Sequence, residues 1–188
     1  IDGGAAGIVM PYIESRSQVE DLVGAVKYRP LKGALLAAYI KGTKEMPENL
    51  QQYISTFNQG NICIANIESV PAMEKLKEIL SVTGLDGVFI GPHDLSISLG
   101  LPEQYDHPDF EAAVTTIIKQ TRALGLHIGI HFSLEPERQV KWMKLGANIV
   151  VHSSDISLFR QRLKQDLQLI KSAAGDTQIT GDHKELVV

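Results

Sequence analysis

The 188-residue chain has little of several features that mark particular classes of protein. It contains a single cysteine, Cys63, in an apolar segment, so no disulfide can form within the chain. We expect Cys63 to be a small buried residue and the protein to work in a reducing cytoplasm. No apolar run approaches the ~20 residues of a membrane span, so no membrane partner is expected. The 18 lysines and arginines are scattered among 22 acidic residues, which argues against a nucleic-acid partner.

What remains has the composition of an ordinary globular protein. Hydrophobic residues make up 44% of the chain and charged residues 21%, and the length suffices for one domain with a substantial core. We predict a single domain over residues 1–174. The segment 175–188 is polar and lacks periodicity, which predicts a loosely ordered tail.

One unit recurs along the sequence: an amphipathic helix ends in glycine, and a short apolar strand follows. The glycines are Gly84, Gly125 and Gly146, which suit the left-handed position that ends a helix. The apolar runs do not alternate with polar residues, and this pattern is typical of parallel sheets covered on both faces. We predict strands at 7–10, 61–67, 87–90, 127–130 and 147–151, with 33–37 as a candidate sixth.

Alternating strands and helices predict an α/β fold with right-handed crossovers. Two closures remain open at this point, a doubly wound open sheet and a (β/α) barrel. A complete (β/α)8 barrel of the TIM type typically needs ~250 residues, so this chain would lack roughly two or three β/α units.

Two acidic residues stand where successive predicted strands end. Glu68 follows the strand 61–67, and Asp94 closes the segment that follows the strand 87–90. Chemistry in parallel α/β proteins gathers at the carboxyl ends of the strands. Either acid alone is explained equally well by a helix-dipole or turn-capping role. Together they favour a site for a hard divalent cation such as Mg²⁺ or Mn²⁺.

Other polar residues follow predicted strands as well. His131 and His152 come after 127–130 and 147–151, and both are candidates for acid–base catalysis because imidazole titrates near ~6.5. A histidine bonded to backbone at a strand end is the alternative for each. Glu14, after the first strand, is expected to order its loop by hydrogen bonding instead of binding metal.

Four segments carry a resemblance to a known family. They are Asp2–Ser15 (DGGAAGIVMPYIES), Tyr28–Gly33 (YRPLKG), Ile67–Ser69 (IES) and Gly87–Ser96 (GVFIGPHDLS). Over residues 1–172 the sequence resembles the class II 2-keto-acid (pyruvate) aldolases of the HpcH/HpaI type. That family includes dihydroxyheptenedioate and 2-dehydro-3-deoxyglucarate aldolases and is related to citrate lyase.

The resemblance implies a fold, a reaction and a site. The fold is a (β/α)8 barrel, usually a homo-hexamer with the last helix exchanged between neighbours. The reaction is reversible aldol cleavage of a hydroxy-2-keto acid to pyruvate and an aldehyde, through a metal-stabilised enolate. By resemblance, Glu68 and Asp94 bind Mg, Mn or Co, and Asn66, Pro92, His93 and Asp94 contact the substrate.

The sequence also departs from the family pattern. Leu35 stands where the family has an arginine, and Asn66 stands where it has a glutamine. The family's catalytic histidine and its acidic partner lie on earlier strands than those found here. We therefore expect an incomplete barrel that matches the C-terminal two-thirds of the family.

Two further functions stay open. One is a catalytically impaired barrel remnant that acts in keto-acid binding or oligomer contacts. The other is a lyase for a citramalyl- or malyl-type thioester. The aldehyde, the stereochemistry, the preferred metal and the oligomer size (hexamer or trimer) are not determined by the sequence.

Overall fold

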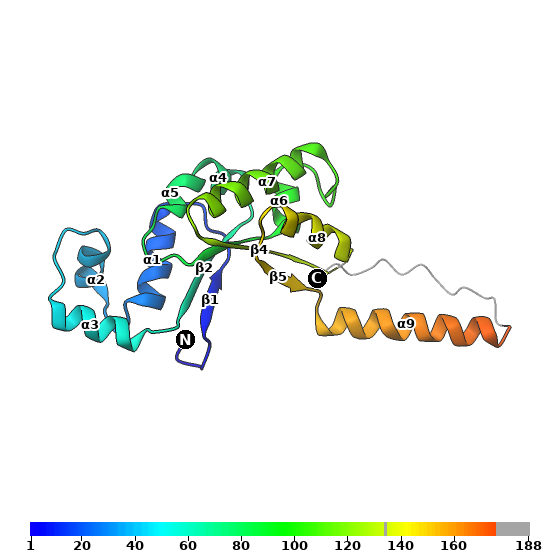
Figure 1. Ribbon diagram of the computed structural model, residues 1–188, viewed down its shortest axis with the longest axis horizontal. Helices are drawn as coiled ribbons and strands as arrows, with labels where there is room; N and C mark the ends of the chain where they lie inside the picture. The colour runs from blue at the N-terminus through cyan, green and yellow to red at the C-terminus, as the bar shows by residue number, and fades with distance from the viewer. Residues whose placement is uncertain (134, 176–188) are drawn as a thin grey trace.

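The computed structural model describes residues 1–133 and 135–175 and shows one parallel sheet (Figure 1). Its strands are β1 (Gly7–Met10), β2 (Ile62–Ile67), β3 (Gly87–Ile90), β4 (His127–Phe132) and β5 (Ile149–His152). They lie side by side in chain order, and each neighbouring pair is parallel. A doubly wound sheet reverses its strand order at a switch point. The sequential order therefore identifies a half barrel of the TIM type, an incomplete barrel as expected.

Nine helices are found in the described residues. They are α1 (Arg16–Lys27), α2 (Gly33–Ile40), α3 (Glu48–Phe57), α4 (Val70–Glu74), α5 (Leu76–Leu80), α6 (Pro92–Ser98), α7 (Pro108–Ala123), α8 (Pro136–Leu145) and α9 (Asp155–Ala173). The candidate sixth strand at 33–37 is wrong, because this segment forms α2. Its Ala and Leu residues are strong helix formers, and this preference prevails over the apolar run that resembled a strand. The predicted tail lies beyond Gly175, outside the described residues.

The two faces of the sheet differ in their cover. On one side, which we call the helix face, the side chains of β2, β3 and β4 are buried against helices. They are Cys63, Ala65, Ile67, Val88, Ile90, Ile128, Ile130 and Phe132. The alternate residues project from the opposite side, the open face, where Val9 is 50% and Ile62 45% exposed. The sequence predicted cover on both faces, and the described residues supply it on one.

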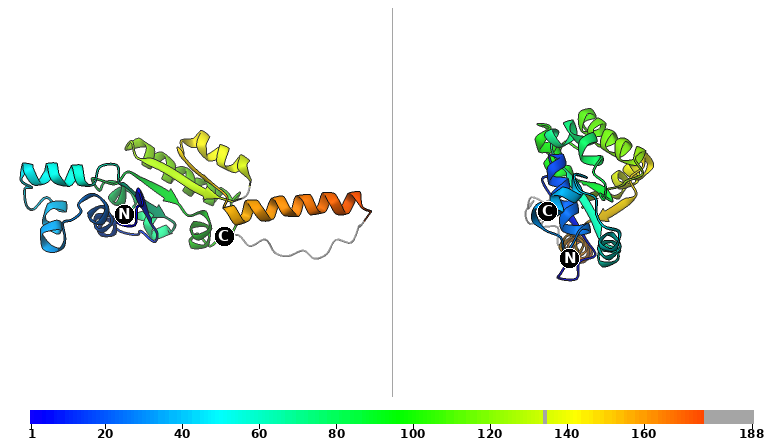
Figure 2. Two further views of the ribbon diagram at one scale, coloured as in Figure 1. Left: turned by 90° about the horizontal axis from the view of Figure 1, so that it is seen from below. Right: turned by 90° about the vertical axis from the view of Figure 1, so that its left-hand side faces the viewer.

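The last helix does not pack behind the sheet. Helix α9 projects away from the rest of the molecule (Figures 1 and 2). In consequence Val150, which pairs with the buried Ile130, remains 45% exposed. Helix α9 also carries exposed apolar side chains: Ile156, Leu158, Phe159, Leu163, Leu167, Leu169 and Ile170. Both surfaces lack cover in the part of the chain that the structure describes.

Cys63 lies in the core on β2 and is fully buried, which confirms the expected role. Burial, with the nearby charge of Asp86, raises the pKa of its thiol to about 12. A thiol that stays protonated is a poor nucleophile. In the described residues, none of the helices combines the length and apolar character needed to cross a bilayer.

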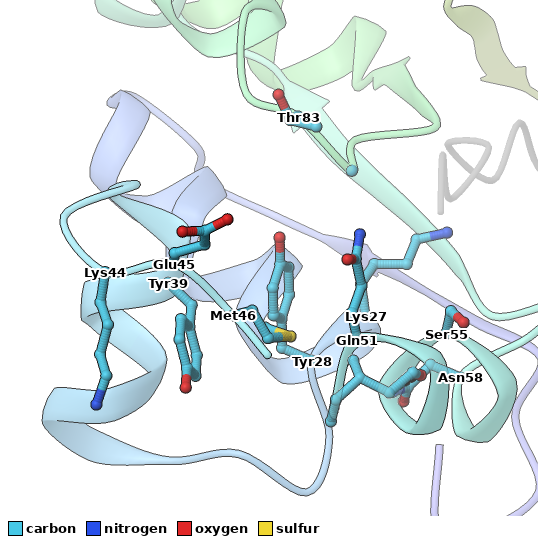
Figure 3. Close-up of a pocket in the computed structure, with 12 residues that line it drawn as sticks. Lys27, Tyr28, Tyr39, Lys44, Glu45, Met46, Gln51, Ser55, Asn58 and Thr83 are labelled. Atoms are coloured by element: carbon cyan, nitrogen blue, oxygen red, sulfur yellow. Dashed lines mark hydrogen bonds between the residues drawn. The ribbon is translucent and has the colours of Figure 1, made fainter. Parts of the chain in front are cut away.

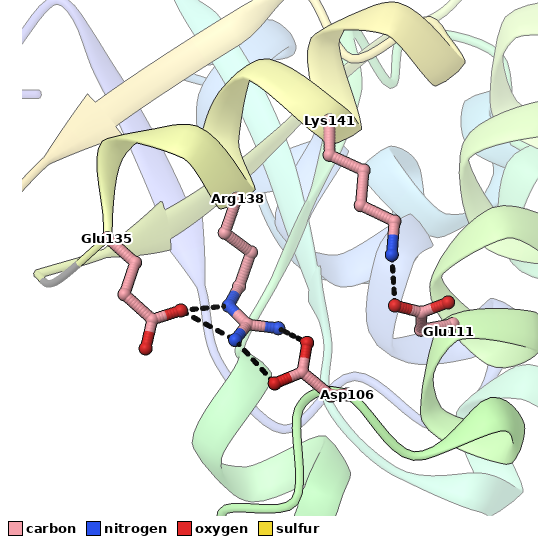
Figure 4. Close-up of polar contacts among 5 residues, drawn as sticks. All are labelled: Asp106, Glu111, Glu135, Arg138 and Lys141. Carbon is pink, nitrogen blue, oxygen red and sulfur yellow. Dashed lines mark hydrogen bonds and ion pairs between the residues drawn. The ribbon is translucent and has the colours of Figure 1, made fainter.

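Arg138 ties α8 to the loop between α6 and α7 at the carboxyl end of β4 (Figure 4). Its guanidinium donates to both carboxylate oxygens of Asp106, at 2.9 and 3.1 Å, and to Glu135 at 2.6 Å. It also lies 5.4 Å from the centroid of the Phe132 ring. Bidentate arginine–carboxylate pairs are the strong members of their class. These contacts link the carboxyl end of β4 to α8 and to the loop between α6 and α7.

Candidate metal centre

The two predicted metal ligands lie at the same edge of the sheet. Glu68 directly follows β2, and Asp94 lies in the first turn of α6, which begins just after β3. Glu68 is 6% exposed, whereas Asp94 is exposed. Burial raises the pKa of Glu68, and the charge of Asp94 raises it further. The negative charge of Asp94 therefore acts on the Glu68 carboxyl group.

The Glu68 carboxylate is held at both oxygens. Oε1 accepts a hydrogen bond of 2.7 Å from the backbone N–H of Tyr12, and Oε2 accepts one of 2.5 Å from Nδ2 of Asn66. Tyr12 follows β1 and has a φ of 55°, in the left-handed region that non-glycine residues seldom adopt. These bonds lower the pKa of Glu68, but the effect of burial is the larger one. The result is a buried carboxylate in a fixed orientation.

Gly91 gives this carboxylate its space. The register of β2 and β3 pairs Ile67 with Ile90, and one step further along the two strands it brings Glu68 beside Gly91. A Cβ atom on Gly91 would lie 2.5 Å from Oε2 of Glu68 and 3.4 Å from Nδ2 of Asn66. Both side chains thus lie over the glycine, and any side chain at position 91 would displace them.

The groups present fit a hard divalent cation. Two carboxylates supply oxygen ligands, and Oδ1 of Asn66 is buried without a hydrogen-bond partner among the described residues. Residues 1–133 and 135–175 contain no cluster of three or more His, Cys, Asp or Glu side chains suited to a metal. A cation here would have two protein carboxylates and take its other ligands from water or substrate. Magnesium sites commonly have this character.

The other predicted substrate contacts open α6. Pro92 occupies the first turn, where its missing N–H costs no hydrogen bond. His93 follows, and its side chain is exposed, with Nδ1 3.8 Å from a carboxylate oxygen of Glu103. The backbone N–H groups of a first helical turn have no partner within the helix. The backbone N–H groups of His93 and Asp94 are therefore suited to the expected substrate contact, and the imidazole is not needed for it.

The register separates the two candidate histidines. His131 pairs with Val151 and lies on the open face, with Nε2 3.2 Å from the carbonyl oxygen of Ser153. His152 pairs with Phe132, whose side chain is buried on the helix face. Because paired residues of parallel strands project to the same side, His152 lies on the face opposite Glu68. Only His131 shares the face of Glu68.

Glu14 and Leu35 are not members of the carboxylate pair. Glu14 accepts a 2.6 Å hydrogen bond from the Ser69 hydroxyl, which confirms its loop-ordering role. Leu35 lies on α2, which packs against the later turns of α1 near Gly24. Helix α1 ends at Lys27, whose ammonium bonds to Asp86 just before β3. Leu35 therefore lies toward the amino end of the sheet, whereas Glu68 lies at the carboxyl end.

A cavity of about 510 Å³ also lies at this amino end, between α1, α2 and α3 (Figure 3). Lys27, Tyr28, Tyr39 and Asn58 are among the residues that line it. Asp86 and Asn61 already bind Lys27, and Asn58 donates to backbone carbonyls. These polar groups serve the fold, so the cavity is separate from the carboxylate pair in both place and chemistry.

Sequence reasoning missed two parts of this centre. The N–H of Tyr12 could not be found, because a backbone amide leaves no mark in the residue type. Gly91 was visible as part of a motif, but its purpose depends on the side chain of the neighbouring strand. A glycine directly after an apolar run is the only local signal for such a contact.

A half barrel with helices on one face and two carboxylates at its carboxyl edge defines the α/β-barrel class, with a candidate divalent-cation site. The family model for HpcH/HpaI aldolase/citrate lyase matches residues 1–161. The chain is 31% identical over 183 residues to the 2-keto-3-deoxy-L-rhamnonate aldolase of Escherichia coli (strain K12), covering 97% of this chain and 68% of that protein. The chain belongs to the HpcH/HpaI aldolase/citrate lyase family.

Solved structures agree with this assignment. An HpcH/HpaI aldolase from Desulfitobacterium hafniense DCB-2 matches with a TM-score of 0.73 at 23% identity, over 96% of this chain and 67% of that one. Citrate synthase SbnG matches with a TM-score of 0.73 at 27% identity, over 93% of this chain and 66% of that one. The fold of this chain is thus the corresponding two-thirds of those structures.

Gly91→Ala tests the contact between β3 and Glu68. We expect it to destabilise the protein by about 1–3 kcal/mol, because the new methyl group overlaps Oε2. In a Glu68→Ala background the same change should cost much less, since the clashing atom is gone. Gly3→Ala is the control, because its Cβ would meet nothing within 4 Å. Equal costs of Gly91→Ala in both backgrounds, by urea unfolding, would contradict the packing described.

The raised pKa of Glu68 predicts a pH dependence for the metal-free protein. The folded state binds the Glu68 proton more tightly than the unfolded chain does. The contribution of this proton to the free energy of unfolding is therefore present below the ordinary pKa of 4.5 and is lost as pH rises through the higher folded pKa. The difference in free energy of unfolding, wild type minus Glu68→Gln, should therefore fall with rising pH in this window. Chemical unfolding with a chelator present measures it, and a difference that rises or stays constant would refute the assignment.

Proposed function

We propose that this chain carries the cation and keto-acid site of a carbon–carbon lyase. The reaction is the reversible aldol cleavage of a hydroxy-2-keto acid to pyruvate and an aldehyde. The observation that supports it most directly is the pair of carboxylates, Glu68 and Asp94, at adjacent strand ends in a member of a lyase family. The raised pKa of Glu68 supports it as well, because perturbed groups gather at functional sites.

Each residue of the centre has a role in this proposal. Glu68 and Asp94 hold a divalent cation (Mg, Mn or Co). When bound, the cation supplies positive charge that stabilises negative charge developing on the keto oxygen. Tyr12 N–H and Asn66 Nδ2 keep the Glu68 carboxylate in its orientation, as partners of metal ligands commonly do. The buried Oδ1 of Asn66 accepts a hydrogen bond from a donor in the occupied site.

The opening of α6 receives the substrate carboxylate. Pro92 presets the first turn, and the backbone N–H groups of His93 and Asp94 serve as donors to the anion. Cleavage then proceeds by loss of the C4 hydroxyl proton and breakage of the C3–C4 bond. The electron pair of that bond moves toward C2 and its oxygen, so negative charge develops on that oxygen. In reverse, the same steps join pyruvate to an aldehyde.

A thioester lyase of the citramalyl or malyl type is the second candidate. The family description that matches this chain names citrate lyase beside the aldolases, and this favours keeping it. Both reactions would use the same carboxylate pair, so only their products distinguish them. Pyruvate released from a hydroxy-2-keto acid supports the first function, and acetyl thioester released from a malyl thioester supports the second. The proposed location, a reducing cytoplasm, suits either one.

Cation binding tests the proposed centre without any need for turnover. We expect wild-type protein to bind Mn²⁺, and Glu68→Gln or Asp94→Asn to weaken binding at least about tenfold, because each removes one of two anionic ligands. Isothermal titration calorimetry or Mn²⁺ paramagnetic resonance measures the affinity.

Glu14→Gln is the matched control, since it removes a nearby carboxylate that is bonded to Ser69 instead. Its affinity for Mn²⁺ should equal that of wild type. A wild-type protein that binds no Mn²⁺ would support the remnant function, and equal binding by the three variants would show that the cation binds elsewhere.

We further propose a homo-oligomer in which α9 is covered by a neighbouring copy, with the hexamer or trimer of the resemblance as the expected state. The exposed apolar side chains of α9 and the uncovered Val150 support it. Phe159→Glu places a charge on that apolar surface and should reduce the mass measured by light scattering. Lys164→Glu, on the same helix, is the control and should leave the mass unchanged. A wild-type monomer would contradict the proposal.

A further inference from the structure

Three residues form a row across the carboxyl edge of the sheet. The registers pair Ile67 with Ile90 and Ile90 with Ile130. One step further along each strand, the row reads Glu68, Gly91, His131. Paired residues on parallel strands project to the same side. A Cβ added at Gly91 would lie 2.5 Å from Oε2 of Glu68, which confirms that positions 68 and 91 project to the same side.

Glycine at the middle position places no side chain of β3 between Glu68 and His131. Two interstrand spacings separate their Cα atoms by about 10 Å. Oε2 of the Glu68 carboxylate lies over Gly91, on the side of β3, only 2.5 Å from where a Cβ at that position would be. His131 is half-buried on the open face. His131 is therefore the next side chain beyond Gly91 on this face of the sheet.

One nitrogen of His131 is committed to the backbone. Nε2 lies 3.2 Å from the carbonyl oxygen of Ser153, and a carbonyl can only accept a hydrogen bond. Nε2 therefore carries the proton, and Nδ1 presents a lone pair. Among the described residues, no hydrogen bond to Nδ1 is found. In this tautomer Nδ1 is the acceptor nitrogen of the ring.

The backbone that orients the ring is itself braced. Ser153 has a φ of 59°, a strained conformation for a residue with a side chain. Its N–H donates to the carbonyl of Phe132 at 3.2 Å. The buried amide of Gln139 donates to the same carbonyl at 2.8 Å and to that of Val151 at 3.2 Å. Hydrogen bonds therefore hold the carbonyl of Phe132, which follows His131, and that of Val151, two residues before Ser153.

We propose that His131 is a catalytic acid–base residue that contacts the C4 hydroxyl of the substrate; the inference rests on the proposed function. In cleavage, Nδ1 takes the hydroxyl proton as the C4–O bond becomes a carbonyl and the C3–C4 bond breaks. The electron pair of that bond stays with the pyruvate fragment. Carbon C3 then takes a proton from water, and His131 returns its proton to water, so the sum is hydroxy-keto acid to pyruvate plus aldehyde. His152, on the opposite face, takes no part.

The test compares two ligands that differ at the C4 hydroxyl, a 4-hydroxy-2-keto acid and pyruvate, with Mg²⁺ present. In ¹⁵N-labelled protein we expect Nε2 of His131 to be protonated. The Nδ1 resonance should shift when the hydroxy acid binds and stay unchanged when pyruvate binds. Wild type should bind the hydroxy acid about three- to tenfold more tightly than pyruvate through this hydrogen bond. Absence of both the shift and the preference would overturn the inference.

His131→Gln is the key variant, because its amide nitrogen can still donate to Ser153 while the side chain cannot accept a proton. We expect Mn²⁺ and pyruvate affinities to stay at the wild-type level, the preference for the hydroxy acid to vanish, and any cleavage rate to fall about 10²–10⁴-fold. His152→Gln is the control and should behave as wild type. If His131→Gln keeps the preference for the hydroxy acid and still binds Mn²⁺, the role of His131 is overturned and the proposed function is not affected. Loss of Mn²⁺ binding in wild type would instead overturn the proposed function and this inference with it.

Discussion

The structure of the centre depends on how one buried carboxylate is accommodated. A charge removed from water is costly unless hydrogen bonds replace the lost hydration. Glu68 receives them from the backbone of Tyr12, beyond β1, and from Asn66 on its own strand. Its side chain then rests on Gly91, beyond β3. Three adjacent strands thus meet at one side chain, and their spacing determines where any ligand of this carboxylate can lie.

The proposed chemistry lies at the carboxyl edge of the sheet, where hydrogen bonds link the strand ends to the helices. Arg138 and Gln139 secure the carboxyl end of β4 from two sides, through Asp106 and through the strand carbonyls. By contrast, the open face and α9 expose apolar side chains, among them Val9 and Phe159. Rigid strand ends hold catalytic groups more precisely than loops do. The exposed surfaces are suited to association, where burial of apolar area supplies the driving force.

Much of this architecture could be predicted from local patterns. Glycines after helices and unbroken apolar runs identified all five strands, and acids at two strand ends predicted the candidate centre. The segment 33–37 failed, because a short apolar run does not distinguish a strand from a helix. Leu35 stands where the family has an arginine, and it lies at the other end of the sheet from Glu68, since α1 carries the chain there before α2 begins.

The sequence by itself determined the α/β class, the buried cysteine and the position of Glu68 and Asp94 at strand ends, because these follow from residue type and short-range order. Only the tertiary structure decided that the strands lie in barrel order, that Tyr12 and Gly91 shape the carboxylate site, and that His131 shares the face of Glu68 while His152 does not. These facts depend on register between strands that are distant in the chain. A shift of one residue would exchange the two faces, and no local pattern records that choice.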